Sequence, residues 1–248
     1  MPTLTTRGRF DDDGDRRPSS TQLVTTEGEW EAADAADDLF IFVHGFDTPD
    51  EAARNQAYTT QLGLEETPLP APVVGYSWDA DRDWDVAKSV ADENGQLLAA
   101  WLLEWTETHP DQSVHVLAYS LGARLTGHAL RVLTDEGHTD RLASVSLLGG
   151  AIPHDSVETD GYYGEAIEAA SRVHNFHSRN DRVLGWVYRV SDRTRAVGYG
   201  GIREPEAAPE PYRDVDVTDL VEDHYSYFQP EEGCLPRVVE TIDRGHDS

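Results

Sequence analysis

Residues 113–125 read Ser-Val-His-Val-Leu-Ala-Tyr-Ser-Leu-Gly-Ala-Arg-Leu, and this stretch decides the fold. Its first half is a short apolar run rich in β-branched residues, which is typical of a buried strand. Its second half begins a pattern with one apolar face, and the apolar positions of that face are Leu121, Leu125, Ala129, Val132 and Leu133. The sequence therefore predicts a strand that turns directly into a helix, with Ser120 at the junction.

Small residues flank Ser120, with Ala118 two positions before it and Gly122 two positions after it. A strand that turns directly into a helix leaves little room for side chains at these positions. This is the pattern of a nucleophile elbow, in which a strained turn holds a serine hydroxyl clear of the sheet at a helix N-terminus. The usual elbow has glycine at the position of Ala118. A serine that only caps a helix gives a similar short pattern, so the rest of the sequence must decide between the two roles.

Apolar runs and one-faced helical patterns alternate along the rest of the chain. Strands are predicted at residues 39–43, 72–78, 142–148, 172–176 and 212–217. Helices are predicted where apolar residues recur at helical spacing, over residues 49–63, 86–105 and 235–242. This order predicts a three-layer α/β/α sandwich with a mostly parallel, doubly wound sheet.

The first of these helices carries explicit end signals. Thr48 is predicted as its N-cap, with Pro49 at the first helical position. Glu51 would complete a capping box with Thr48, and Gly63 would mark the end of the helix.

A chain of this length and pattern routinely forms one domain, so we expect a single domain over residues 1–248 with no sizeable cap insertion between 151 and 172. Residues 1–37 form an acidic, turn-rich N-terminal segment in which edge strands are possible, one of them at 21–26. Residues 191–211 are rich in Gly, Pro and charge, which predicts a surface excursion without a core of its own.

The chain is strongly acidic, with 47 Asp and Glu against 20 Lys and Arg and a formal net charge of -27. A negative field of this size repels nucleic acid and anionic membranes, so neither is an expected partner. No apolar run is long enough to span a bilayer, and the N-terminus does not resemble a secretory signal. We expect a cytoplasmic protein whose surface is adapted to high salt, because salt screens the self-repulsion. The oligomeric state stays open.

Neither a metal nor a cofactor is expected. Cys234 is the only cysteine, which excludes an intramolecular disulfide and a cysteine-based zinc site. His174 and His177 are three apart on a strand, so alternation points them to opposite faces and disfavours a metal pair. His115 is expected to pack in the core, and His44 to hold the loop that follows its strand.

Ser120, Asp181 and His224 each follow a predicted strand, so they should meet at the carboxyl edge of the sheet, where such sheets bind ligands. A serine hydroxyl becomes a good nucleophile when an imidazole takes its proton, and a carboxylate then orients the imidazole. The chain order Ser, Asp, His is that of α/β-hydrolases. Two backbone N–H groups are expected to stabilise the oxyanion: Leu121 in the elbow and Phe46 in the loop after residues 39–43.

Several carboxylates in the second half compete for the orienting role. Asp214 and Asp216 alternate on the late strand, and Asp223 adjoins His224, where neighbouring side chains diverge. Asp181 begins the loop after a strand, at the edge where the histidine arrives. We therefore predict a hydrogen bond between Asp181 and His224, whose other ring nitrogen faces Ser120.

At these residues the chain resembles the α/β-hydrolase superfamily, and it is most similar to uncharacterised prokaryotic, haloarchaeal-type members. The resemblance covers roughly residues 38–230 and rests on motifs at 43–46, 76–78, 118–122, 179–181 and 224–225. It implies an α/β-hydrolase fold with a minimal cap. Ala118 and the absence of a sizeable cap depart from the family pattern and leave the substrate undefined.

We expect a serine hydrolase that cleaves a small carboxylic ester or thioester through an acyl-enzyme intermediate. The alternative is a non-catalytic binding protein on the same scaffold, since a fold does not dictate a function. A dehalogenase or epoxide hydrolase is disfavoured, because those enzymes carry an aspartate where this chain has Ser120.

Overall fold

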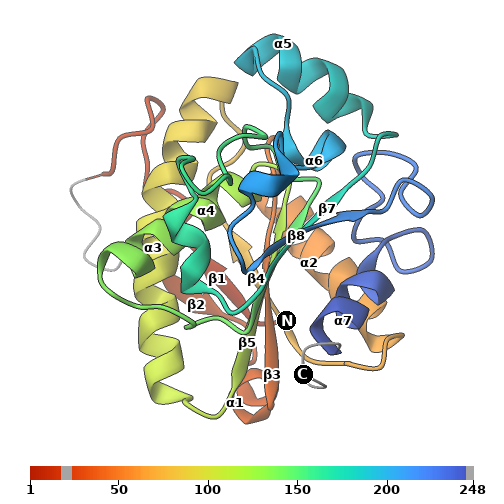
Figure 1. The fold of residues 1–248 in the computed structure, drawn as a ribbon. Coiled ribbons are helices and arrows are strands. Elements are labelled where there is room, and N and C mark those ends of the chain that lie inside the picture. Colours follow the sequence, from red (N-terminus) through yellow and green to blue (C-terminus); the bar gives the residue numbers. More distant parts are fainter. Residues whose placement is uncertain (18–23, 244–248) are drawn as a thin grey trace.

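The computed structural model describes residues 1–17 and 24–243, which surround one eight-stranded sheet (Figure 1). The strands are β1 (Thr3–Thr5), β2 (Thr25–Glu27), β3 (Asp38–Val43), β4 (Val73–Ser77), β5 (Ser113–Tyr119), β6 (Ser144–Leu148), β7 (Val173–His177) and β8 (Tyr212–Asp216). They lie in the order β2-β1-β4-β3-β5-β6-β7-β8. Every neighbouring pair is parallel except β1 with β2.

Helices cover both faces of this sheet. The α-helices are α1 (Glu31–Ala35), α2 (Asp50–Glu65), α3 (Trp84–Thr108), α4 (Gly122–Asp135), α5 (Arg189–Asp192), α6 (Val197–Gly200) and α7 (Leu235–Asp243). The connecting segments contain a π-helix and two 3-10 helices, namely η2 (Val183–Tyr188), η1 (Glu165–Ala169) and η3 (Pro205–Ala207). Figure 1 shows α3 and α4 on one side of the sheet and α2 and α7 on the other. The predicted three-layer α/β/α sandwich is confirmed.

The central strand β3 shows why its sequence is an unbroken apolar run. Leu39, Ile41 and Val43 pack into the core that α3 and α4 cover. Phe40 and Phe42 pack into the second core, which α2 and α7 cover. Since both faces of a parallel sheet are buried, alternation between apolar and polar residues disappears.

The N-terminal segment extends the sheet at one edge. Strand β1 pairs with β4, and β2 pairs with β1 at the outside. Of the strand expected at 21–26, residues 21–23 lie outside the described part of the chain, and β2 begins at Thr25.

The N-cap and the C-terminal end predicted for α2 are each wrong by a few residues. Pro49 is the N-cap and no side-chain cap is formed, because the Thr48 hydroxyl donates to the Phe46 carbonyl at 3.1 Å within the preceding loop. Gly63 lies inside the helix. A Cβ at Gly63 would lie 2.5 Å from Leu235 Cδ1, so this glycine lets α7 pack closely against α2.

Residues 191–211 were predicted to form a surface excursion without a core of its own, and this prediction is wrong. Ala196 and Val197 are fully buried, and the Gly198 N–H donates to the Gly150 carbonyl at 3.0 Å. A Cβ at Gly198 would lie 2.3 Å from the Gly149 carbonyl carbon. The small residues that suggested a loose loop instead allow backbone to pack on backbone at the edge of the sheet.

Candidate active site

Ser120 lies at the turn between β5 and α4 with φ +53°, an unusual value for a residue with a side chain. The Ser120 N–H donates to the Leu148 carbonyl at 3.0 Å, and its own carbonyl accepts the Ala151 N–H at 2.9 Å. A Cβ at Gly122 would lie 2.4 Å from the Val43 carbonyl oxygen. The strained serine and the obligatory glycine confirm the predicted elbow geometry.

Ala118 fits where the usual elbow motif has glycine. It is fully buried on β5, opposite Val43 of β3 and Leu147 of β6. Its methyl group belongs to the core between the sheet and the helices α3 and α4. With the elbow at the end of β5 and helices on both faces of the sheet, the chain has the α/β-hydrolase fold.

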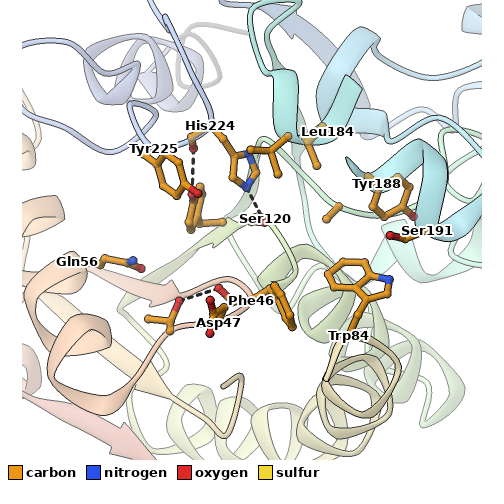
Figure 2. A pocket seen from close by; sticks show the side chains of 14 residues that line it. Phe46, Asp47, Gln56, Trp84, Ser120, Leu184, Tyr188, Ser191, His224 and Tyr225 are labelled. Carbon is orange, nitrogen blue, oxygen red and sulfur yellow. Dashed lines mark hydrogen bonds between the residues drawn. The ribbon is translucent and has the colours of Figure 1, made fainter. Parts of the chain in front are cut away.

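His224 joins Ser120 to Asp181, and Figure 2 shows its contact with Ser120. Its Nε2 lies 2.9 Å from Ser120 Oγ. Its Nδ1 lies 2.6 Å from Asp181 Oδ2. Ser120 follows β5, Asp181 follows β7 and His224 follows β8, and these parallel strands end at the same edge of the sheet. Both predicted hydrogen bonds are confirmed. The Tyr119 hydroxyl, which the sequence did not single out, donates to the His224 carbonyl at 2.9 Å.

The Asp181 carboxylate is fully buried, and each of its oxygens accepts a hydrogen bond. Oδ1 accepts the Leu184 N–H at 2.9 Å, and Oδ2 accepts the Tyr227 hydroxyl at 3.3 Å in addition to His224. Burial, reinforced by the nearby Asp181 charge, raises the pKa of Tyr227 well above its usual range. Tyr227 therefore remains a protonated donor that holds the carboxylate in place.

The competing carboxylates have other partners. Asp216 Oδ1 accepts the Thr218 N–H at 2.9 Å. Asp214 Oδ2 accepts the Ile202 N–H at 2.9 Å, while its Oδ1 accepts Asn175 of the neighbouring strand β7 and the Tyr212 hydroxyl of its own strand. Asp223 stabilises the turn that carries His224 by accepting the Tyr225 N–H at 2.8 Å.

The loop after β3 lies directly against the serine. A Cβ at Gly45 would lie 2.7 Å from Ser120 Cβ and 3.2 Å from Ser120 Oγ, so only glycine leaves room there. Neither the Phe46 N–H, next in this loop, nor the Leu121 N–H donates to an acceptor among the described residues. Both groups are therefore available as donors beside the hydroxyl, and their role in binding an oxyanion stays a prediction.

His44 holds this loop in place through hydrogen bonds of both ring nitrogens. Its Nδ1 donates to the Gly45 carbonyl at 3.0 Å, and its Nε2 accepts the Trp78 N–H at 3.1 Å. Burial lowers the pKa of His44 to about 3, which keeps the ring neutral. The sequence predicted this holding role. The sequence carried no signal for Arg7, which follows strand β1 and donates a hydrogen bond to the Thr48 carbonyl at 2.7 Å.

Ser120 and His224 line a mostly apolar pocket of about 400 Å³ (Figure 2). One wall is an aromatic row in which Phe46 and Tyr188 each contact Trp84 edge-on, at ring distances of 5.0 and 6.1 Å. Val183 and Leu184 of η2 add apolar surface. The sequence did not predict η2 or α5, because this short segment has neither a long apolar run nor helix caps.

A salt bridge fixes the wall of the pocket. Lys88 Nζ of α3 lies 2.9 Å from Asp192 Oδ1 at the end of α5. The Trp84 indole N–H donates to the other oxygen of Asp192 at 2.8 Å. The helix pair η2–α5 is thereby tied to α3 across the pocket.

The remaining candidates are structural groups. His115 is buried and contacts Asp38 and Ser144 at 3.0 and 2.8 Å. Cys234 is buried, and desolvation raises the pKa of its thiol to about 12. Residues 1–17 and 24–243 contain no cluster of His, Cys, Asp or Glu that is arranged to hold a metal ion.

Several solved structures share this architecture. The type II thioesterase YbtT of the yersiniabactin pathway has a TM-score of 0.48 and 13% identity, covering 87% of this chain and 96% of that one. The catalytic core of acetyl xylan esterase from Trichoderma reesei has a TM-score of 0.48 and 10% identity, covering 84% and 98%. At such low identity the likeness concerns the fold alone.

Sequence relatives come from plants and fungi. The transmembrane and coiled-coil domain-containing protein STS1 of Oryza sativa subsp. japonica is 30% identical over an alignment of 189 residues that covers 71% of this chain and 27% of that protein. An uncharacterised membrane protein of Schizosaccharomyces pombe is 32% identical over 147 residues, 59% of this chain and 24% of that protein. The chain thus spans about a quarter of the length of these curated relatives.

These relatives are eukaryotic and give no support to the expected likeness to haloarchaeal hydrolases. Within the described residues, no helix has both the length and the apolar character needed to cross a bilayer.

A family model described as a protein of unknown function, DUF726, matches residues 56–240. The match covers most of the chain and includes Ser120, Asp181 and His224, but it begins after the loop that carries Phe46. The chain therefore belongs to the DUF726 family.

Proposed function

We propose that the chain is a serine hydrolase that cleaves a carboxylic ester or thioester of a small molecule through an acyl-enzyme. The observation that carries the proposal is His224, which lies within hydrogen-bond distance of both Ser120 Oγ (2.9 Å) and the buried Asp181 carboxylate (2.6 Å). This is the geometry expected of a nucleophile, its base and the group that orients the base. A serine that only capped a helix would need neither partner.

Acylation begins when Ser120 Oγ attacks the carbonyl carbon of the substrate and passes its proton to His224 Nε2. Asp181 keeps the other proton on Nδ1 and stabilises the imidazolium that forms. The negative charge that develops on the carbonyl oxygen is held by the N–H groups of Leu121 and Phe46. The bond to the alcohol or thiol then breaks, and His224 returns the proton to this leaving group.

Deacylation repeats these steps with water. Water attacks the acyl carbon and gives one proton to His224, and the ester bond to Ser120 breaks. The proton returns to Ser120 Oγ, and the carboxylic acid is released. The apolar wall of Phe46, Trp84 and Tyr188 suits the hydrocarbon part of an acyl group, because burying it there removes apolar surface from water.

Labelling with a fluorophosphonate in molar KCl tests the proposal. The wild-type protein should be labelled covalently, and Ser120→Ala should abolish labelling. Ser191→Ala is the matched control, because Ser191 lines the same pocket without a hydrogen bond to His224. Absence of labelling in a folded wild-type protein would favour the alternative, a non-catalytic binding protein on this scaffold.

A further inference from the structure

The segment from Arg179 to Arg195 has a net charge of opposite sign to that of the whole protein. These 17 residues contain five of the 20 basic residues but only two of the 47 acidic ones, so the segment carries a net charge of +3 in a chain of -27. It includes η2 and α5, whose inner side lines the pocket at Ser120. Local positive charge in so acidic a chain indicates a partner of negative charge.

A second pocket, of about 590 Å³, lies on this segment. We call it the arginine pocket and define it by the residues that line it: Arg179, Gly185, Trp186, Arg189, Arg195 and Tyr199. The Trp186 side chain is 76% exposed, although a large aromatic group usually lies buried. Neither Ser120 nor His224 lines this pocket, so it is separate from the candidate active site.

The arginine side chains of this segment have no hydrogen-bonded or ion-paired partner among the described residues, although Arg179 is near enough to Asp216 to contribute, after the hydrogen bonds from Thr218, to the lowered pKa of that carboxyl. The side chains of Arg179, Arg189 and Arg195 make no hydrogen bond and no ion pair within 4.0 Å there, and the same holds for Arg182 and Arg193. Every other arginine in residues 1–17 and 24–243 contacts a carboxylate, a hydrogen-bond acceptor or an aromatic ring. These arginines are Arg7, Arg9, Arg16, Arg17, Arg54, Arg82, Arg124, Arg131, Arg141, Arg172, Arg203, Arg213 and Arg237.

The two carboxylates of the segment do not neutralise these arginines. Asp181 is buried and bonded to His224, and Asp192 is occupied by Lys88 and Trp84. Three cations that line one concave site with no carboxylate within 4.0 Å of their nitrogens repel one another, which favours an anion between them. A guanidinium presents a planar fork of donors that matches the oxygens of a phosphate, and Arg is used for this purpose more often than Lys.

We infer that the arginine pocket binds a phosphate group, carried either by a soluble small molecule or by a lipid headgroup. Arg179, Arg189 and Arg195 supply the donors, and the rings of Trp186 and Tyr199 contact the part of the ligand next to the phosphate. The concave shape favours an inserted group over a flat surface. The inference is independent of the proposed hydrolase activity, because binding requires no turnover.

The position of the pocket suggests how its ligand relates to Ser120. Gly185, Trp186 and Arg189 face the arginine pocket, whereas Val183, Leu184 and Tyr188 of the same segment face the catalytic pocket. A Cβ at Gly185 would lie 2.7 Å from Tyr199 Cε2, so the glycine keeps η2 close to the floor of the arginine pocket. A bound phosphate would therefore lie across η2 from the serine.

Isothermal titration calorimetry with inorganic pyrophosphate tests the site, at one KCl concentration for all proteins. The wild type should bind pyrophosphate, and the triple variant Arg179→Gln, Arg189→Gln, Arg195→Gln should bind at least about tenfold more weakly, since each charge-assisted hydrogen bond contributes roughly a factor of ten. The matched control is Arg16→Gln, Arg213→Gln, Arg237→Gln, which removes the same charge from surface ion pairs elsewhere. Its affinity should match that of the wild type.

A second arm identifies the source of the phosphate. Vesicles of phosphatidylcholine with about 20 mol% phosphatidic acid are sedimented with each protein, and pure phosphatidylcholine vesicles serve as the reference. If the ligand is a lipid headgroup, the wild type, but not the triple variant, should sediment with the vesicles that contain phosphatidic acid. A soluble ligand predicts pyrophosphate binding without sedimentation. The inference is overturned if the wild type binds neither probe, or if the control variant loses binding as much as the triple variant.

Should the triple glutamine variant unfold, the corresponding triple lysine variant replaces it. Lysine keeps the charge but removes the planar fork, so pyrophosphate should bind more weakly than to the wild type. Equal affinity in this folded variant would contradict recognition by the guanidinium groups.

Discussion

Replacing Asp181 by Asn should abolish most of the nucleophilic reactivity of Ser120 without unfolding the protein. The structure predicts how the new amide would be oriented. The Leu184 N–H donates to Oδ1 at 2.9 Å, so the amide oxygen must occupy that position and the NH₂ group must face His224. His224 Nδ1 must then accept a hydrogen bond, which leaves the ring proton on Nε2. A protonated Nε2 cannot take the proton of Ser120.

The size of the effect follows from the alternative orientation. Turning the amide round would leave the buried Leu184 N–H without an acceptor, which costs about 1–3 kcal/mol. The unreactive tautomer is therefore favoured by a factor of roughly 5 to 150, at about 1.4 kcal/mol for each factor of ten. Loss of the Asp181 charge beside the imidazolium lowers the rate further. The total loss should approach about 10⁴, the size known for this substitution in serine proteases.

The rate of fluorophosphonate labelling measures this loss, and the release of p-nitrophenol from a short-chain ester measures it independently. Asp216→Asn is the matched control, because this carboxylate ends the neighbouring strand β8 and accepts a hydrogen bond from Thr218 rather than from His224. It should label at a rate close to that of the wild type. If Asp181→Asn keeps full reactivity while Asp216→Asn loses it, the orienting carboxylate has been assigned to the wrong residue.

Three further predictions concern stability. Gly122→Ala should lower the free energy of unfolding by about 1–3 kcal/mol in denaturant titrations, because its Cβ would lie 2.4 Å from the Val43 carbonyl oxygen. Gly200→Ala, whose Cβ would meet nothing closer than 4.0 Å, should change little, and equal losses would contradict the packing argument. The melting temperature should rise from dilute buffer to molar KCl, because the Debye length shrinks from about 10 Å to about 3 Å; a flat or falling curve would remove the argument for salt adaptation. Burial lowers the pKa of His44 from 6.5 to about 3, so protonation of the unfolded chain should lower stability as the pH falls below 6.5, by up to about 1.4 kcal/mol per pH unit. His44→Gln should unfold with a shallower dependence on pH in this range, and identical slopes would exclude His44 as the cause.

Much of the fold could be predicted from local patterns. The apolar runs at 39–43 and 113–119 became β3 and β5, because only a strand buried on both faces tolerates such runs. The elbow at Ser120 was predicted because a strand and a helix joined by one residue constrain that residue and its small neighbours. The order Ser120, Asp181, His224 was predicted as a set, because parallel strands end at the same edge.

Other features followed no local rule. Thr48 has the right chemistry for an N-cap, yet its hydroxyl bonds within the loop beside Phe46. The glycines at 63 and 198 suggested a helix end and a loose loop, yet both are points of close packing. For the two glycines the deciding neighbours, Leu235 and Gly149, are distant in the sequence, so their positions could not enter a prediction from short stretches.

The sequence by itself determined the layers of the sheet, the strained serine and the three residues that meet beside it, because these depend on the periodicity of apolar residues and on the order of strands. Only the tertiary structure decided which carboxylates were already engaged by other donors, how η2 and α5 form the wall of the pocket, and that the side chains of the arginines from 179 to 195 make no hydrogen bond or ion pair among the described residues. The physical reason is that hydrogen bonding, packing and charge pairing act between groups that are close in space but distant in the chain, as with Trp84 and Asp192 in the pocket wall, which are 108 residues apart.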